Sequence, residues 1–107
     1  MQKTKRYLYT VFLCQQSIEK MLKAFHLRRL KKEAPFTHNL VYLESLVDTG
    51  MEEEHKVLLS ELTTYYIAGR YPTYKAKLSG LVKKKKAQEI MEQTEGLFQW
   101  LRRNLKS

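Results

Sequence analysis

The stretch that decides the fold is residues 7–30, YLYTVFLCQQSIEKMLKAFHLRRL, which contains neither glycine nor proline. Its apolar residues recur at intervals of three, four and seven, which is the spacing of one face of an α-helix and not the alternation of a strand. These residues are Leu8, Val11, Phe12, Ile18, Met21, Leu22, Phe25 and Leu30. At ~1.5 Å per residue such a helix is about 35 Å long. Every other helix is therefore expected to pack against this face.

Two residues near the middle of this helix interrupt its apolar pattern. Gln15 lies one turn from Val11 and from Glu19, close to the apolar face. Because buried amides are usually satisfied within the fold, Gln15 is expected to fix the register between helices, and contact with a ligand or a second subunit is the alternative. Cys14 is the only cysteine, so it is expected to be a small buried hydrophobic residue rather than part of a disulfide or a thiolate metal cluster.

The chain after Pro35 predicts a short helix and then a long one. Thr37 or Asn39 can cap the short helix, and Gly50 suits the left-handed residue past its end. Its expected buried residues are Leu40, Leu43, Leu46 and Val47. The long helix is expected from about residue 51, with three glutamates stabilising its first turn, to the break set by Gly69 and Pro72.

The last third predicts a break over residues 71–74, a helical turn over residues 75–82 and a final long helix over residues 83–105. Trp100 lies off the apolar stripe of that helix, which points either to a contact with a partner or to packing over the end of a neighbouring helix. The sequence thus predicts an all-α protein, a small antiparallel up-and-down bundle resembling a four-helix bundle, with residues 1–107 as one domain. The predicted core is Val11, Ile18, Leu22, Phe25, Leu62, Ile90, Met91 and Leu101.

Three short segments resemble motifs of the HEPN domain family, in the family's order. Residues 14–24, CQQSIEKMLKA, resemble its "QQ-x-x-EK-x-x-KA" helix, residues 37–40, THNL, its "TH-x-L" turn, and residues 70–72 its "RYP". The resemblance covers about residues 7–101. It implies a small helical bundle that forms a homodimer through the helices before and after the central turn. Members usually carry another helix before the Gln-Gln helix, where this chain has only residues 1–6.

The resemblance also bears on catalysis. Ribonucleases of the family carry an arginine and a histidine with four to six residues between them, and in a dimer the two copies line one cleft in which the histidine serves as acid and base in RNA cleavage. Counted from Arg70, that histidine would fall at residues 75–77, which are Lys, Ala and Lys. A lysine of ordinary pKa, about 10, is a poor general base at neutral pH. The chain is therefore expected to be non-catalytic.

The candidate ligand site surrounds Arg70. An arginine at a helix end beside a proline can hold phosphate oxygens in its planar fork, and nearby tyrosines can stack on a base. The residues assigned to it are Arg70, Tyr71, Tyr74, Lys75 and Lys77. The alternative is that Arg70 satisfies the last carbonyls of its own helix and the tyrosines pack. His38, beside a helix start, is expected to be a neutral hydrogen-bonding residue, and no metal or cofactor is predicted.

The formal net charge of +9 favours anionic partners. No apolar run approaches the ~20 residues of a membrane span, so a cytoplasmic protein is expected. The leading hypothesis is a nucleotide- or nucleic-acid-binding module, working with a separate nucleotidyltransferase in a toxin–antitoxin-like pair, as the resemblance implies. The alternatives are a degenerate metal-independent ribonuclease toxin and a dimerisation scaffold without a ligand.

Overall fold

The computed structural model describes the backbone of residues 2–105, and it describes the side chains of these residues except 2–6, 72, 75, 78, 79 and 81. This part of the chain forms five helices and no strand. They are α1 (Gln2–Leu30), α2 (Leu40–Val47), α3 (Glu53–Ala68), α4 (Pro72–Leu81) and α5 (Lys84–Leu105). The all-α fold class is confirmed. None of these helices is long and apolar enough to cross a bilayer.

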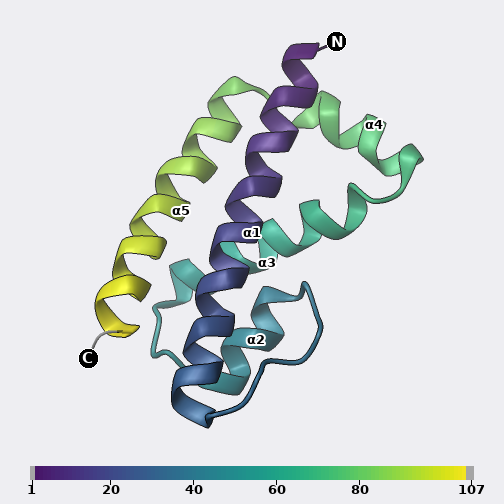
Figure 1. Cartoon of the computed structure of the whole chain (residues 1–107). Helices are drawn as coiled ribbons and strands as arrows, with labels where there is room; N and C mark the ends of the chain where they lie inside the picture. Colours follow the sequence, from purple (N-terminus) through teal and green to yellow (C-terminus); the bar gives the residue numbers. More distant parts are fainter. Residues whose placement is uncertain (1, 106–107) are drawn as a thin grey trace.

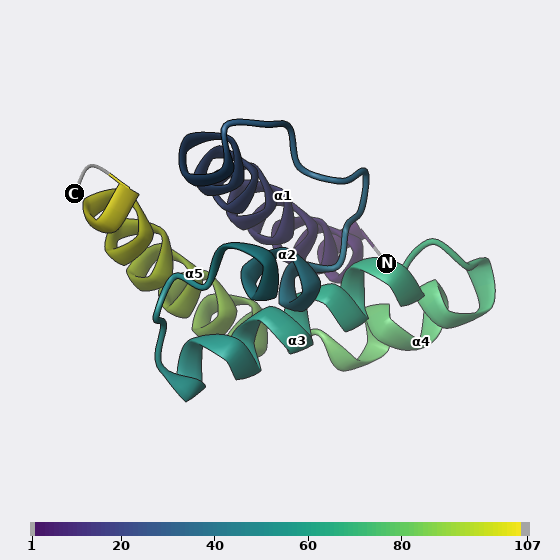
Figure 2. The ribbon, with the colours of Figure 1, turned by 90° about the horizontal axis from the view of Figure 1, so that it is seen from below.

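Helix α1 is the centre of the bundle and contacts all four other helices. Figure 1 shows that α5 lies beside α1 and runs in the same direction, while α3 crosses behind α1. Seen from below in Figure 2, α2 lies between α1 and α3, and α4 extends from the far end of α3. The molecule measures 44 × 25 × 20 Å. The face predicted from residues 7–30 is therefore the surface against which the rest of the chain packs.

Seven of the eight residues predicted to form the core are buried. Val11, Ile18, Leu22 and the other predicted core residues are buried, but Met91 is 48% exposed. Helix α5 buries Ala87, Ile90, Thr94, Leu97 and Leu101. Those positions form one narrow face at spacings of three and four, and the residue after Ile90 is turned about 100° away from it. The prediction for Met91 was thus wrong. Cys14 is buried as expected, and burial raises the pKa of its thiol.

Helix α2 begins and ends at caps supplied by its own flanks and by α1. Asn39 accepts a hydrogen bond from the backbone N–H of Tyr42 at 3.1 Å, which selects Asn39 over Thr37 as the N-cap. At the other end Asp48, with φ +46°, takes the left-handed conformation expected of Gly50, whose φ is +78° two residues later. Arg29 of α1 donates to the carbonyls of Val47 and Asp48. These bonds tie the end of α2 to α1.

The predicted break after α3 is shorter in the structure. Helix α3 ends at Ala68 and α4 already begins at Pro72, so Tyr74 lies inside a helix and the expected break over residues 72–74 was wrong. Proline suits the first position of a helix, because its fixed φ is helical and its missing N–H has no partner to lose there. Leu46, expected to be buried, is only half-buried.

Trp100 packs within the bundle. Its ring lies 5.7 Å from the ring of His55, in the first turn of α3. This contact matches the alternative in which Trp100 covers the end of a neighbouring helix.

Candidate functional site

The centre of the candidate site is a pair of polar residues on the buried face of α1. Gln15 and Glu19 stand one turn apart, and Gln15 Nε2 donates to Glu19 Oε1 at 2.9 Å. The same nitrogen donates to the backbone carbonyl of His38 at 3.0 Å, so the amide ties the loop before α2 to α1. Gln15 is fully buried, and among the described residues its Oε1 has no hydrogen-bond partner. The amide is therefore structural, but it joins α1 to the loop before α2 instead of fixing the register between two helices, and it is only partly satisfied.

The Glu19 carboxylate is nearly buried and gathers three donors. Besides the amide of Gln15, it accepts hydrogen bonds from Lys23 Nζ at 3.0 Å and from His38 Nδ1 at 2.8 Å. Burial raises the pKa of the Glu19 carboxyl, but the hydrogen bonds from the amide, imidazole and ammonium groups and the charge of Lys23 together hold that pKa below its usual value. The carboxylate is therefore ionised at neutral pH.

His38 is held in one orientation by this carboxylate. A carboxylate oxygen can only accept, so Nδ1 carries the proton, and in the neutral ring Nε2 keeps its lone pair. The adjoining loop is fixed from both sides: Thr37 Oγ1 accepts from the N–H of Asn39, and buried Thr63 of α3 accepts from the N–H of Leu40 at 3.1 Å. The His38 side chain remains 23% exposed. This is an imidazole oriented by an acid, with its second nitrogen available.

A row of rings leads from His38 to Arg70. The ring of Tyr66, on α3, lies 5.0 Å from the His38 ring, and the Arg70 guanidinium lies 5.3 Å from the centre of the Tyr66 ring. Phe12 of α1 meets Tyr66 edge-on at 5.7 Å and supports it from the core side. Arg70 and His38 therefore both contact the Tyr66 ring, although two helices, α2 and α3, separate them in the sequence.

Gly69 allows the Phe12 ring of α1 to pack closely against the end of α3. It is buried at the end of α3, and a Cβ built on it would overlap the tip of the Phe12 ring. Its φ of −67° is an ordinary helical value, so the requirement is for space rather than for a special backbone conformation. The Phe12 ring occupies the space left by the missing side chain.

The predicted site residues are partly brought together. Arg70 is exposed and lies over Tyr66, while Tyr71 and Tyr74, 58% and 54% exposed, pair edge-on with each other at 6.2 Å. Lys77 is exposed on α4, and the side chain of Lys75 lies outside the described residues. Tyr71 and Tyr74 thus pack against each other while both stay exposed, so the assignment of these residues to a ligand site stays a prediction.

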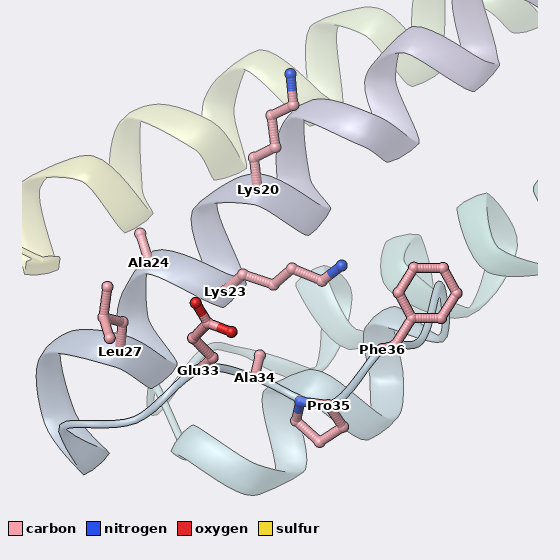
Figure 3. A pocket seen from close by; sticks show the side chains of 8 residues that line it. All are labelled: Lys20, Lys23, Ala24, Leu27, Glu33, Ala34, Pro35 and Phe36. Atoms are coloured by element: carbon pink, nitrogen blue, oxygen red, sulfur yellow. The ribbon is translucent and has the colours of Figure 1, made fainter.

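A cavity of about 480 Å³ opens beside this cluster, between the second half of α1 and the loop before α2. Figure 3 shows Lys23 extending toward Phe36, while Lys20 points away from the loop. Phe36 is 91% exposed, its ring meets His38 edge-on at 5.7 Å, and its centre lies 5.8 Å from Lys23 Nζ. The cavity is lined by Lys20, Lys23, Ala24, Leu27, Glu33, Ala34, Pro35 and Phe36. Lys23 thus lines the cavity and also binds Glu19.

The residues missing from the sequence-based site are Glu19, His38, Tyr66 and Phe36. The signal that could have found them is the meeting of the three motif segments, since Gln15 and Glu19 come from the first, His38 from the second and Arg70 from the third. The cluster offers an exposed guanidinium for an anion, aromatic faces for a base and an oriented imidazole for proton transfer. Within the described part of the chain, no group of three or more potential metal ligands gathers.

One comparison with known proteins bears on the whole chain. The model of the HEPN domain family matches residues 1–104. No curated protein and no solved structure matches the chain.

Proposed function

We propose that this chain, which belongs to the HEPN domain family, is a cytoplasmic module that binds a phosphate-bearing ligand, a nucleotide or RNA, at the platform of Arg70 and Tyr66. The observation that carries the proposal is the position of Arg70: this exposed residue places its guanidinium over the Tyr66 ring, which the His38 imidazole also contacts. The net charge of +9 and the family's general association with nucleotides and RNA support it.

The chemistry of binding follows from these groups. The guanidinium lies over the Tyr66 ring, and its planar fork of N–H groups can hold two phosphate oxygens in one plane. Tyr71, in the turn before α4, and Tyr74, on α4, present exposed rings on which a base can stack. Lys77, and Lys75 on the same helix, add positive charge for neighbouring phosphates.

Substitution of Arg70 tests the proposal. Arg70→Lys keeps the charge but loses the planar fork, so it is expected to weaken binding by about 1.5–3 kcal/mol, or roughly tenfold to a hundredfold. The measurement is titration of fluorescently labelled RNA and of ATP at several salt concentrations, with Arg102→Lys on the exposed end of α5 as the matched control. Lys75→Ala and Lys77→Ala are each expected to lower the salt slope by about one unit. Equal binding by wild type and Arg70→Lys would show that the ligand site is not at Arg70, and no binding at low salt would leave a scaffold without a ligand.

We propose further that the module works as a homodimer and with a nucleotidyltransferase in a toxin–antitoxin-like pair. An apolar groove between α1 and α5 supports the dimer, because Leu13 and Met91, each 48% exposed, line it together with half-buried Phe98. Sedimentation equilibrium at micromolar concentration tests the dimer, for which a monomer of 12.8 kDa is the contrary result. Co-purification with a small nucleotidyltransferase encoded beside it tests the pair.

A second candidate function is metal-independent cleavage of RNA, and the Glu19–His38 pair favours it. With Nδ1 held by the carboxylate, Nε2 can take the proton of a ribose 2′-hydroxyl. The 2′ oxygen then bonds to phosphorus as the bond to the 5′ oxygen breaks and water protonates that oxygen, which leaves a 2′,3′-cyclic phosphate and a 5′-hydroxyl. Cleavage in EDTA that is lost in His38→Asn and at a single 2′-deoxy position would support this activity. Cleavage that persists in His38→Asn would exclude it.

A further inference from the structure

The side chain that the fold explains least is Phe36. It follows Pro35 in the loop before α2 and is 91% exposed, although burying a phenylalanine is worth about 1.5–3 kcal/mol. Its ring is nevertheless placed, since it meets the His38 imidazole edge-on at 5.7 Å and the Lys23 ammonium group lies 5.8 Å from its centre. An aromatic face turned to solvent is the form that stacking platforms for bases take.

The cavity beside Phe36 has the size and chemistry of a site for a base. Its volume of about 480 Å³ lies within the range of small-molecule sites. Ala24, Leu27 and Pro35 provide apolar walls, and Lys23 and Glu33 place a donor and an acceptor at the rim (Figure 3). The lysine charge here is offset by carboxylates, because Glu19 already binds Lys23 at 3.0 Å. The cavity therefore suits a flat, uncharged ring with polar edges better than a phosphate.

The cavity and Arg70 lie at the two ends of one row of contacts. Phe36 meets His38 at 5.7 Å, His38 meets Tyr66 at 5.0 Å, and Arg70 lies 5.3 Å from the centre of Tyr66. In a mononucleotide the base and the phosphates are joined through one sugar, whereas here the contacts from Phe36 to Arg70 run through two further rings, those of His38 and Tyr66. A strand of several nucleotides can occupy both ends at once.

We propose that the cavity beside Phe36 is a base subsite, and that the ligand is a single-stranded oligonucleotide which reaches from this subsite to Arg70. The inference rests on the proposed function for the phosphate site at Arg70. It adds a second point of contact, which makes affinity depend on the length of the strand. The row of Phe36, His38 and Tyr66 is then the surface that the strand crosses.

The test compares a labelled RNA octamer with ATP on three proteins. Stacking of one base is worth about 1–3 kcal/mol, so Phe36→Ala is expected to weaken octamer binding by about 5- to 150-fold and to leave ATP binding unchanged. Phe36→Trp, which keeps an aromatic face, should retain octamer binding. Val57→Ala, a change at a 62% exposed apolar residue on α3, is the matched control. Because Phe36 is exposed, the thermal midpoints of the variants should match that of wild type.

An abasic position moved stepwise along the octamer locates the base in the cavity. At one position the abasic strand should bind wild type as weakly as the intact strand binds Phe36→Ala, and the two changes together should cost little more than either alone. If Arg70→Lys weakens both ligands while Phe36→Ala weakens neither, the subsite is wrong and the phosphate site stands. If Phe36→Ala changes the sedimentation of the protein instead, Phe36 is a protein contact and the subsite is also wrong. If neither ligand binds at low salt, the proposed function fails with it.

Discussion

Replacing Gly69 by alanine tests how α3 is joined to α1 beneath the site. Gly69 has helical φ and ψ of −67° and −10°, so alanine would by itself stabilise the folded chain by about 0.5–1 kcal/mol. The added Cβ would overlap the tip of the Phe12 ring and would lie 3.0 Å from the carbonyl oxygen of Tyr65. Overpacking of this kind costs about 1–3 kcal/mol. The net expectation is a loss of about 1–2 kcal/mol.

Urea denaturation measures this loss as a lower midpoint, by about 0.5–1 M. Gly96→Ala on α5 is the matched control, because nothing lies within 4 Å of the Cβ that it would add, and it is expected to stabilise the protein. In a Phe12→Ala background the ring is absent, so Gly69→Ala should become stabilising there as well, with a coupling energy of at least about 1 kcal/mol. Stabilisation by Gly69→Ala in the wild-type chain would refute the packing of Phe12 against Gly69.

Three further outcomes are expected. Ile18→Ala should cost about 2–5 kcal/mol in urea denaturation because Ile18 is fully buried, whereas Met91→Ala should stay within about 0.5 kcal/mol, and a cost for Ile18 below that value would put it on the surface. Glu19→Gln should destabilise the protein at neutral pH. Because folding lowers the pKa of Glu19, the difference in unfolding free energy from wild type should shrink as the pH falls through that lowered pKa. A difference that grew toward acid pH would contradict the hydrogen-bonded carboxylate. Leu13→Glu, in the groove beside Met91, should convert a dimer to monomer in sedimentation equilibrium while leaving the thermal midpoint of the monomer unchanged.

Much of the fold could be predicted because it depends on periodicity. The buried positions of α1 and α5 repeat every three or four residues, and that repeat is visible in the sequence. The prediction that Met91 is buried was wrong because the sequence does not show whether a helix packs against one neighbour or two. With two neighbours the residue next to Ile90 would also be buried, and with one it is exposed. The predicted break over residues 72–74 was wrong because a proline can mark either the end of one helix or the first turn of the next, and Pro72 begins α4.

The candidate site was less accessible to sequence reasoning. Arg70 was found because it stands beside a glycine and a proline that punctuate the chain. The contacts that give it a platform come from Tyr66, one turn earlier, and from His38, across the bundle. Spacing along a helix predicts which residues share its face, but it does not predict which loop lies over that face, and the position of His38 is set by its loop.

Lys23 takes part in both the ion pair with Glu19 and the lining of the cavity beside Phe36, and this couples the two. Its ammonium group holds the Glu19 carboxylate at 3.0 Å, and the same side chain lines the cavity beside Phe36. A molecule in the cavity that drew Lys23 toward itself would weaken the ion pair and favour uptake of a proton by Glu19. Thermodynamic reciprocity requires the converse by the same factor, so a proton on Glu19 would release Lys23 and tighten the cavity's hold on that molecule. Occupancy of the cavity and protonation of the Glu19 carboxylate would thus be coupled equilibria.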